Sequence, residues 1–167
     1  MGLFREVELP VVVSGRLFLH RMPGRDEALG QIWAELESRK IAAVVCLAES
    51  TELGSKSPDY AKALERNTVP CEVIRFDIPD FGVPSDRSAF WELALGIAER
   101  LRAGDNLLIH CAAGRGRTGT LAECVLIALG ADTAAAHQAV EDAGSRAETP
   151  EQRELILWCT AQRAAAR

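Results

Sequence analysis

One continuous apolar run, Ile41–Ala48, constrains the fold of this chain more than any other feature of its sequence. The run is far too short to cross a bilayer, but it is typical of a strand that lies in a parallel sheet and is covered on both faces. Cys71–Phe76 and Asn106–His110 are expected to be strands of the same sheet, with helical segments between them. This alternation predicts an α/β fold with a central, mainly parallel sheet of about 4–5 strands flanked by helices.

The N-terminal part of the chain has two further β-type runs. Leu9–Val13 and Arg16–His20 are separated by the turn signal Ser14-Gly15, and this arrangement predicts a hairpin. Asp26 is expected to cap a helix that ends just before the apolar run described above.

Helices dominate the rest of the chain, and the last third is expected to be entirely helical. The expected helices run from a Ser57 cap to Asn67, from a Ser85 cap to about Arg102, from Arg117 to about Gly130, from Asp132 to Ala143, and from Thr149 to near the end. Asp77–Pro84 contains prolines and a glycine and is expected to be a loop. Because neither an internal repeat nor a linker divides the chain, we expect a single domain over residues 1–167.

Charge and cysteine content argue against several functions. A net charge of −5 and an isoelectric point near 5.3 disfavour binding to nucleic acid or anionic lipid, which requires broad positive fields. The five cysteines are odd in number and lack the C-x-x-C pairing of metal sites, which indicates reduced thiols in the cytoplasm. We therefore expect a cytoplasmic monomer without a metal or a membrane span, in which one cysteine has a special role.

A short glycine-rich loop, Cys111–Arg117, lies between the expected strand Asn106–His110 and a helix. The backbone amides of such a turn converge and the helix N-terminus adds positive potential, so the loop is suited to bind an anion. A thiolate is stabilised in the same setting, so Cys111 is expected to be ionised at neutral pH and to act as a nucleophile. The planar guanidinium of Arg117 can bind two phosphate oxygens and stabilise charge in the transition state. The residues expected to bind the substrate phosphate are Ala112, Ala113, Gly114, Arg115, Gly116 and Arg117.

Three other interpretations of this loop are weaker. Gly114-x-Gly116-x-x-Gly119 matches the dinucleotide-binding fingerprint, but no second strand ending in an acidic residue follows it. A Walker loop is excluded because the sequence contains no Gly-Lys-Ser/Thr. A cysteine at the end of a strand is usually a small buried apolar residue, which is the expected role of the other four cysteines, Cys46, Cys71, Cys124 and Cys159.

The pattern His110-Cys-x5-Arg117-Thr-Gly119 resembles the signature of the protein tyrosine phosphatase superfamily. The compact length is similar to that of its dual-specificity and small prokaryotic or archaeal-type members, and the resemblance extends from about Ile41 to Gln152. Membership implies that a phosphate monoester is hydrolysed in two steps through a phosphocysteine intermediate, without a metal or another cofactor.

The resemblance also implies a general acid on a movable loop. Ile78-Pro-Asp80-Phe-Gly-Val-Pro84 resembles the loop that carries this acid, with Asp80 in the acid position and Ile78 in place of a tryptophan. Taken alone, Asp80 would be an ordinary residue of a polar turn, and Asp77 is the alternative acid.

Three more residues have both a structural and a catalytic interpretation. Thr118 either caps the helix or, as the resemblance implies, donates a hydrogen bond to the cysteine sulfur as it leaves in the second step. Gln152 either completes a capping box with Thr149 or orients the hydrolytic water. His110 is expected to support the loop through hydrogen bonds rather than to act as a base.

The substrate is less constrained than the reaction. The short chain leaves little room for the phosphotyrosine-recognition loop of large tyrosine-specific enzymes, which favours a shallower pocket for phosphotyrosine, with phosphoserine and phosphothreonine as further substrates, in a protein or peptide. Arg115 resembles the basic residue with which phosphoinositide phosphatases meet additional phosphates, although Ala112 stands where those loops have a second one. Its alternative is to point to solvent or to pair with an acid. Inositol lipids or phosphates are thus the second candidate, ahead of other esters such as RNA 5′-phosphates and of a phosphate-binding module without turnover.

Cys46 carries a hypothesis about regulation. It resembles the second cysteine with which some relatives trap the oxidised nucleophile as a reversible disulfide, and it ends a strand expected to neighbour that of Cys111. The alternative is the buried apolar role given above.

Overall fold

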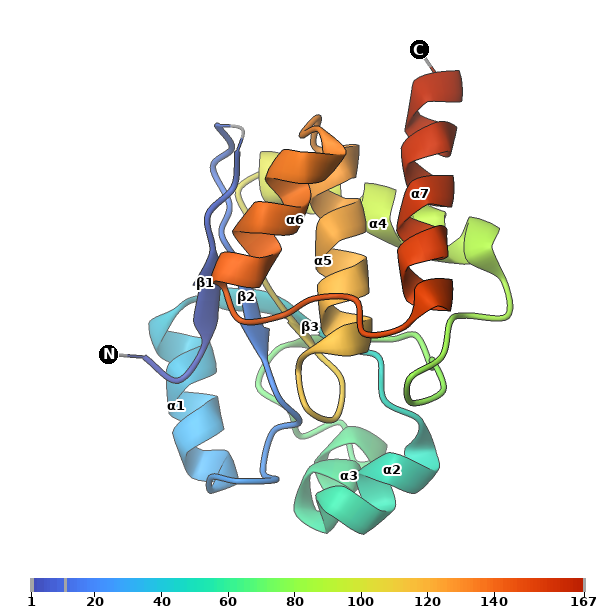
Figure 1. Ribbon diagram of the computed structural model, residues 1–167. Helices are drawn as coiled ribbons and strands as arrows, with labels where there is room; N and C mark the ends of the chain where they lie inside the picture. The colour runs from blue at the N-terminus through green and yellow to red at the C-terminus, as the bar shows by residue number, and fades with distance from the viewer. Residues whose placement is uncertain (1, 11, 167) are drawn as a thin grey trace.

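The computed structural model describes residues 2–10 and 12–166 as a five-stranded sheet with helices on both faces (Figure 1). The predicted α/β architecture with a helical C-terminal third is confirmed. In chain order the elements are β1 (Arg5–Val7), β2 (Leu17–His20), α1 (Leu29–Ser38), β3 (Ile41–Cys46), α2 (Ser50–Lys56), α3 (Pro58–Glu65), β4 (Glu72–Arg75), α4 (Arg87–Arg102), β5 (Asn106–His110), α5 (Gly116–Ala128), α6 (Thr133–Asp142) and α7 (Pro150–Ala165).

The strand order of the sheet is β1-β2-β5-β3-β4. β2, β5, β3 and β4 are parallel, and β1 pairs with β2 in the antiparallel direction at one edge. In the register of the central strands, His110 of β5 lies between His20 of β2 and Cys46 of β3. The carboxyl ends of three strands therefore meet at one edge of the sheet, which is where ligands bind in open α/β sheets.

The predicted N-terminal hairpin is present, but its first strand is not the expected one. β2 pairs with Arg5–Val7, whereas the described residues of Leu9–Val13 belong to the connection and Val11 lies outside the described residues. Pro10 has no N–H with which to pair in a sheet. Val7, by contrast, is only 2% exposed, so burial of its side chain favours the earlier segment.

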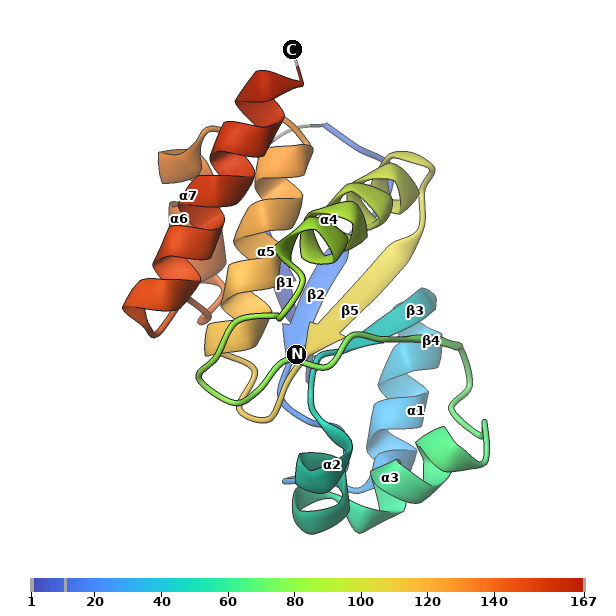
Figure 2. The same cartoon turned by 90° about the vertical axis from the view of Figure 1, so that its right-hand side faces the viewer.

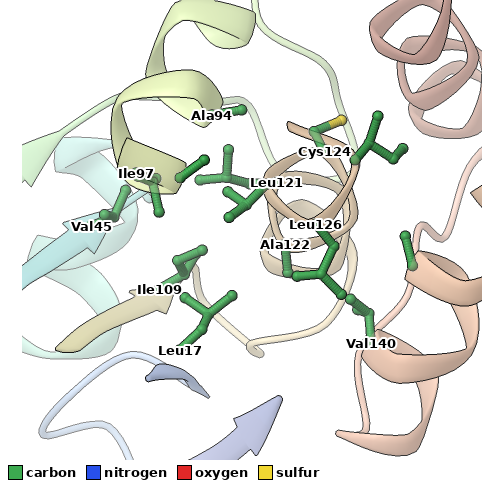
Figure 3. Close-up of a cluster of buried hydrophobic side chains, with 14 of the residues drawn as sticks. Leu17, Val45, Ala94, Ile97, Ile109, Leu121, Ala122, Cys124, Leu126 and Val140 are labelled. Atoms are coloured by element: carbon green, nitrogen blue, oxygen red, sulfur yellow. The ribbon is translucent and has the colours of Figure 1, made fainter. Parts of the chain in front are cut away.

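Helices cover both faces of the sheet (Figure 2). α4 and α5 lie on one face, α6 and α7 pack against α5, and α1, α2 and α3 lie on the other side. Figure 3 shows the larger core, in which Leu121 of α5 points toward Ile97 of α4 and Leu126 points toward Val140 of α6. All residues of α5 from Gly116 to Ile127 are buried, so neighbouring elements fix the helix that follows the Cys111 loop. None of the helices in the described part of the chain is long and apolar enough to cross a membrane.

Asp26 and Ser85 are not the helix caps that the sequence predicted, and one helix was not predicted. Asp26 does not cap α1 but forms an ion pair with Arg21 at 3.0 Å. α4 is capped by Asp86 rather than Ser85, through a carboxylate oxygen that accepts a backbone N–H at 3.0 Å. The unpredicted helix is α2, which follows the apolar strand β3 closely and brings new side chains to the edge of the sheet where the strands end.

Candidate active site

Cys111 directly follows β5, and the loop after it leads into the N-terminus of α5. The residue is 2% exposed and lines a cavity of about 200 Å³ at the carboxyl edge of the sheet. The cavity brings together these residues: Arg25, Lys56, Asp80, Phe81, Cys111, Ala112, Ala113, Gly116, Arg117 and Glu148. The predicted nucleophile, arginine and acid therefore lie in one place.

The Arg117 guanidinium is held in a fixed orientation by a carboxylate that the sequence analysis did not identify. Its Nη1 and Nη2 atoms donate to the two oxygens of Glu52 in α2, each at 2.8 Å. Burial lowers the pKa of Arg117, but the hydrogen bonds that it donates to Glu52 and the negative groups around it outweigh this effect and raise the pKa overall. Arg117 is only 2% exposed, so the site contains a permanent, oriented positive charge.

Asp80 reaches Arg117 from the loop between β4 and α4. Its Oδ1 accepts a hydrogen bond from Nη2 of Arg117 at 3.0 Å, and the carbonyl of Ile78 accepts one from Nη1 at 2.8 Å. Asp77 is directed elsewhere, since its carboxylate pairs with Arg75 at 3.0 Å. Of the two candidate acids, only Asp80 lines the cavity.

Phe81 stands next to Asp80 with its ring at the cavity. Its side chain is 61% exposed, which is unusual for a phenylalanine in a chain with a large buried core. Its backbone has a φ of +60°, a conformation that a bulky residue rarely adopts and that is found at functional loops. The acid loop thus presents an apolar ring to solvent at the same cavity as Cys111.

The Cys111 loop is supported from behind by residues far away in sequence. The carbonyl oxygen of Gly114 accepts hydrogen bonds from Nη2 of Arg5 at 2.7 Å and from Oγ of Ser145 at 2.5 Å. Gly114 has a φ of +72°, and a Cβ there would lie 2.5 Å from the carbonyl oxygen of His20. Only glycine fits this position, because both the backbone conformation and the close approach exclude a side chain.

His110 links the loop to α3. Its Nδ1 lies 2.9 Å from the carbonyl oxygen of Cys111, which can only accept, so Nδ1 carries the proton and Nε2 is the acceptor. The hydroxyl of Tyr60 then donates to Nε2 at 2.7 Å. Burial lowers the pKa of His110 to about 4, so the ring is neutral at pH 7. This geometry supports a bracing role, which stays a prediction.

Thr118 is not the helix cap that its position suggested. The N-cap of α5 is Arg115, and the Thr118 hydroxyl is buried without a hydrogen-bond partner among the described residues. A buried hydroxyl without a partner is costly and is characteristic of groups kept for chemistry. The capping interpretation is therefore wrong, and the proposed contact with the leaving sulfur stays a prediction.

Gln152 connects α7 with the acid loop. The Thr149 side chain caps α7 through the N–H of Gln152 at 3.2 Å, as expected, while Oε1 of Gln152 accepts the N–H of Glu148 at 2.7 Å. Nε2 of Gln152 donates to the carbonyl of Gly82 at 3.2 Å. The amide thus bonds to the loop that carries Asp80, but it does not line the cavity.

The family follows from a comparison with known proteins. The PTP-SAK family, described as "Swiss Army Knife protein, DSP-PTPase phosphatase domain", has a model that matches residues 11–164. The chain belongs to this phosphatase family. It is thus an enzyme of the dual-specificity and protein tyrosine phosphatase type, and the resemblance inferred from its sequence is confirmed.

Solved phosphatases share the fold over almost the whole chain. The structure of Tk-PTP in its active form is 30% identical, with a TM-score of 0.68, and the match covers 95% of this chain and 97% of that one. Kinase associated phosphatase (KAP) is similar in fold with a TM-score of 0.82 at 21% identity, covering 99% and 98% of the two chains. PTPMT1 in complex with PI(5)P is similar in fold with a TM-score of 0.72 at 18% identity, covering 90% and 93%. No curated protein matches the chain significantly.

Several predicted site residues of this phosphatase do not line the catalytic cavity, namely Cys46, His110, Gly114, Arg115, Thr118 and Gln152. Arg115 is exposed and lines two neighbouring cavities. Its backbone carbonyl accepts the N–H of Gly119, but its guanidinium has no hydrogen bond or ion pair with any residue that the structure describes. Cys46 is completely buried, its thiol donates to the carbonyl of Ala48 at 3.9 Å, and burial raises its pKa to about 11. A redox role of Cys46 remains a prediction, and its thiol is protonated at neutral pH.

Sequence reasoning missed the residues that orient the phosphatase site from outside its motif. They are Arg5, Glu52, Tyr60 and Ser145, together with the cavity residues Arg25, Lys56 and Glu148. The available signal was the acidic pair Glu49 and Glu52 just beyond β3, because β3 ends beside β5 in a parallel sheet. No group of three or more His, Cys, Asp or Glu residues in the described chain is arranged to hold a metal ion.

Proposed function

We propose that this phosphatase hydrolyses phosphotyrosine in proteins or peptides through a phosphocysteine intermediate on Cys111. The observation that carries the proposal is the shared cavity of Cys111, Arg117 and Asp80, with the exposed ring of Phe81 beside it. The three polar groups supply a nucleophile, an oriented cation and a proton donor, which are the parts that a phosphate monoester requires.

In the first step, the Cys111 thiolate attacks phosphorus and forms a P–S bond while the bond to the tyrosyl oxygen breaks. The phosphate oxygens bind the loop amides and the outward side of the Arg117 fork, whose other side stays on Glu52. Arriving phosphate competes with Asp80 for Nη2 of Arg117 and frees its carboxylate, which takes up a proton from solvent and then gives this proton to the leaving oxygen. The leaving group departs as a neutral phenol.

In the second step, water attacks the phosphocysteine and the P–S bond breaks. Asp80, now a carboxylate, accepts a proton from the water. The hydroxyl of Thr118, which has no hydrogen-bond partner among the described residues, donates to the departing sulfur of Cys111. Gln152 releases the carbonyl of Gly82 and turns its amide toward the water.

The ring of Phe81 favours an aryl ester over an alkyl ester. A phosphotyrosine side chain carries its phosphate at the far end of a ring. With the phosphate bound in the cavity, the tyrosyl ring would lie at the mouth of the cavity and pack against the ring of Phe81. Aromatic pairs of this kind contribute about 0.5–1.5 kcal/mol beyond burial. Phosphoserine and phosphothreonine lack this contact and are proposed as slower substrates.

Inositol phosphates form the second candidate because the Arg115 guanidinium, which is part of the loop, has no ion pair among the residues that the structure describes. The structural neighbour PTPMT1 was solved with PI(5)P, which shows that this fold can hold such a ligand in that protein. At 18% identity the likeness extends to the fold alone.

The decisive experiment compares phosphate release from a phosphotyrosine peptide with release from a soluble phosphoinositide, both with chelator and reductant and with Cys111→Ser as the blank. Faster release from the peptide supports the proposal, and faster release from the phosphoinositide contradicts it. Phe81→Ala is expected to raise KM for the phosphotyrosine peptide severalfold, with little change for a phosphoserine peptide, since a lost aromatic contact corresponds to about a 2- to 12-fold change. Leu157→Ala removes another exposed apolar side chain, from α7, and serves as the matched control.

A further inference from the structure

A second cavity lies directly beside the catalytic one. It has a volume of about 300 Å³ and is separated from the catalytic cavity by Ala113, which lines both. Its residues come from the N-terminal segment, the end of β2, the Cys111 loop and the turn after α6, namely Leu3, Arg5, His20, Arg21, Ala113, Arg115 and Gly144. We call it the arginine pocket.

The arginine pocket is lined by three arginines and no acidic residue. The guanidinium of Arg115 has no hydrogen bond or ion pair within the described chain. Arg21 is 45% exposed and pairs with Asp26 and Glu27, but neither carboxylate belongs to the lining. Arg5 uses its guanidinium to hold the loop, so it contributes mainly charge to the pocket.

These arginines repel one another. The pKa of Arg5 is lowered first by burial and then by the positive charges of Arg115 and Arg21, whereas the negative charge of Cys111 acts in the opposite direction. Like charges gathered around a concave surface raise the local concentration of anions, and a bound anion would relieve the repulsion.

The neighbouring large cavity does not have this character. It measures about 690 Å³ and also includes Arg115, but its other arginines, Arg146 and Arg153, are accompanied by Glu141 and Glu148. Its charges are mixed, so it does not select anions as the arginine pocket does.

We propose that the arginine pocket binds a second phosphate group, carried by the same phosphopeptide whose phosphotyrosine occupies the catalytic cavity. This inference rests on the function proposed above. The shared wall at Ala113 places the two anion sites side by side, so one short peptide segment can supply both groups. Leu3 and Arg5 precede residues 11–164, so part of the pocket lies outside the segment that the family model matches.

The test uses a peptide with one phosphotyrosine and four versions of it with a phosphothreonine one or two residues before or after. Mass spectrometry identifies which phosphate is lost, and initial rates give kcat/KM for each peptide. At least one doubly phosphorylated peptide is expected to exceed the singly phosphorylated one by about tenfold, since a charge-assisted hydrogen bond has a value of this order.

Arg21→Gln is the informative variant because the Arg21 side chain pairs with Asp26 and Glu27 and has no hydrogen bond to Cys111 or its loop among the described residues; only the backbone of Arg21, which the variant leaves in place, lies against Gly114. It is expected to lose most of the gain from the second phosphate while keeping the kcat/KM of wild type for the singly phosphorylated peptide. Arg146→Gln removes a more exposed charge, 68% against 45% for Arg21, from the neighbouring cavity and is expected to keep the gain. An unchanged thermal midpoint establishes that both variants are folded.

Each alternative outcome identifies what failed. If wild type hydrolyses the singly phosphorylated peptide but gains nothing from any second phosphate, the arginine pocket is not a substrate site. If Arg21→Gln and Arg146→Gln lose the gain from the second phosphate equally, the proposal is also overturned, because the gain would then depend on the overall charge of the protein and not on the arginine pocket. No Cys111-dependent hydrolysis of any peptide would overturn the proposed function itself. If the enzyme prefers inositol 1,4-bisphosphate, if this preference depends on Arg21, and if no peptide gains from a second phosphate, then a peptide is not the carrier of the second phosphate.

Discussion

Glu52→Gln tests the claim that a carboxylate outside the motif fixes the phosphate-binding arginine. Glu52 accepts both arms of the Arg117 fork at 2.8 Å and also the N–H of Glu49 at 3.1 Å. Glutamine keeps the shape of the side chain but removes the charge and at least one bond to Arg117. Removing one partner of a buried pair costs about 3–5 kcal/mol. Because Arg117 keeps its bonds to Ile78 and Asp80, we expect the lower end, about 3 kcal/mol.

Thermal unfolding measures this loss directly. In a chain of this length each kcal/mol shifts the midpoint by about 2–4 °C, so Glu52→Gln is expected to lower the midpoint by about 6–12 °C. Its kcat/KM is expected to fall at least about tenfold, because a misplaced guanidinium no longer meets the transition state. Glu49→Gln changes the other half of the same α2 capping box without touching Arg117, and it is expected to cost about 1 kcal/mol or less.

The pH dependence gives the argument a second test. Burial raises the pKa of Glu52, but hydrogen bonds from Arg117 and the Glu49 backbone outweigh it and lower the pKa overall. A lowered folded-state pKa adds stability that is fully present above the unfolded value of about 4.3 and is lost as the pH falls through the folded value. The difference between wild type and Glu52→Gln should therefore be constant near neutrality and shrink in acid. A midpoint within about 2 °C of that of Glu49→Gln at pH 7 would refute the reasoning.

The remaining predictions concern the supports of the loop and of α5. Tyr60→Phe leaves Nε2 of His110 buried without a donor, so chemical denaturation should show a loss of about 1–3 kcal/mol, and an unchanged midpoint would contradict this. Burial lowers the pKa of His110 to about 4, so the unfolded chain binds a proton there at a higher pH than the folded one does. The free energy of unfolding of wild type should therefore fall by about 3 kcal/mol between pH 6.5 and pH 4, and a constant value over this range would contradict a buried neutral ring. Gly119→Ala places a Cβ 2.5 Å from the backbone nitrogen of Arg146 and should cost about 1–3 kcal/mol in the same assay, whereas Gly96→Ala on the exposed side of α4 meets nothing within 4 Å and should be neutral or stabilising. Equal effects of the two alanines would exclude the steric explanation.

Much of the fold could be predicted from the sequence because its central strands are buried on both faces. Such strands appear as short apolar runs, and Ile41–Cys46 and Asn106–His110 both lie within the predicted ranges. The Cys111 loop was identified for a similar reason, since its nucleophile and arginine are neighbours in sequence as well as in space.

The supports of the site could not be predicted in this way because they come from distant parts of the chain. Arg5 and Gly114 are 109 residues apart, and no local pattern connects an arginine in an edge strand with a glycine carbonyl. Glu52 lies in a helix of seven residues that is too short to show periodicity. The cap assigned to Thr118 failed because the chain enters the helix two residues earlier, at Gly116.

The hydrogen bond between Arg5 and Gly114 has a practical consequence for the choice of domain boundaries when this enzyme is expressed. A protein trimmed to the boundaries of the family match, residues 11–164, would retain Cys111, Asp80 and Arg117. It would lack β1, so the edge of β2 would be uncovered and the loop behind the nucleophile would keep only Ser145 on its carbonyl. The unit that homology defines is therefore smaller than the unit that holds the nucleophile in place.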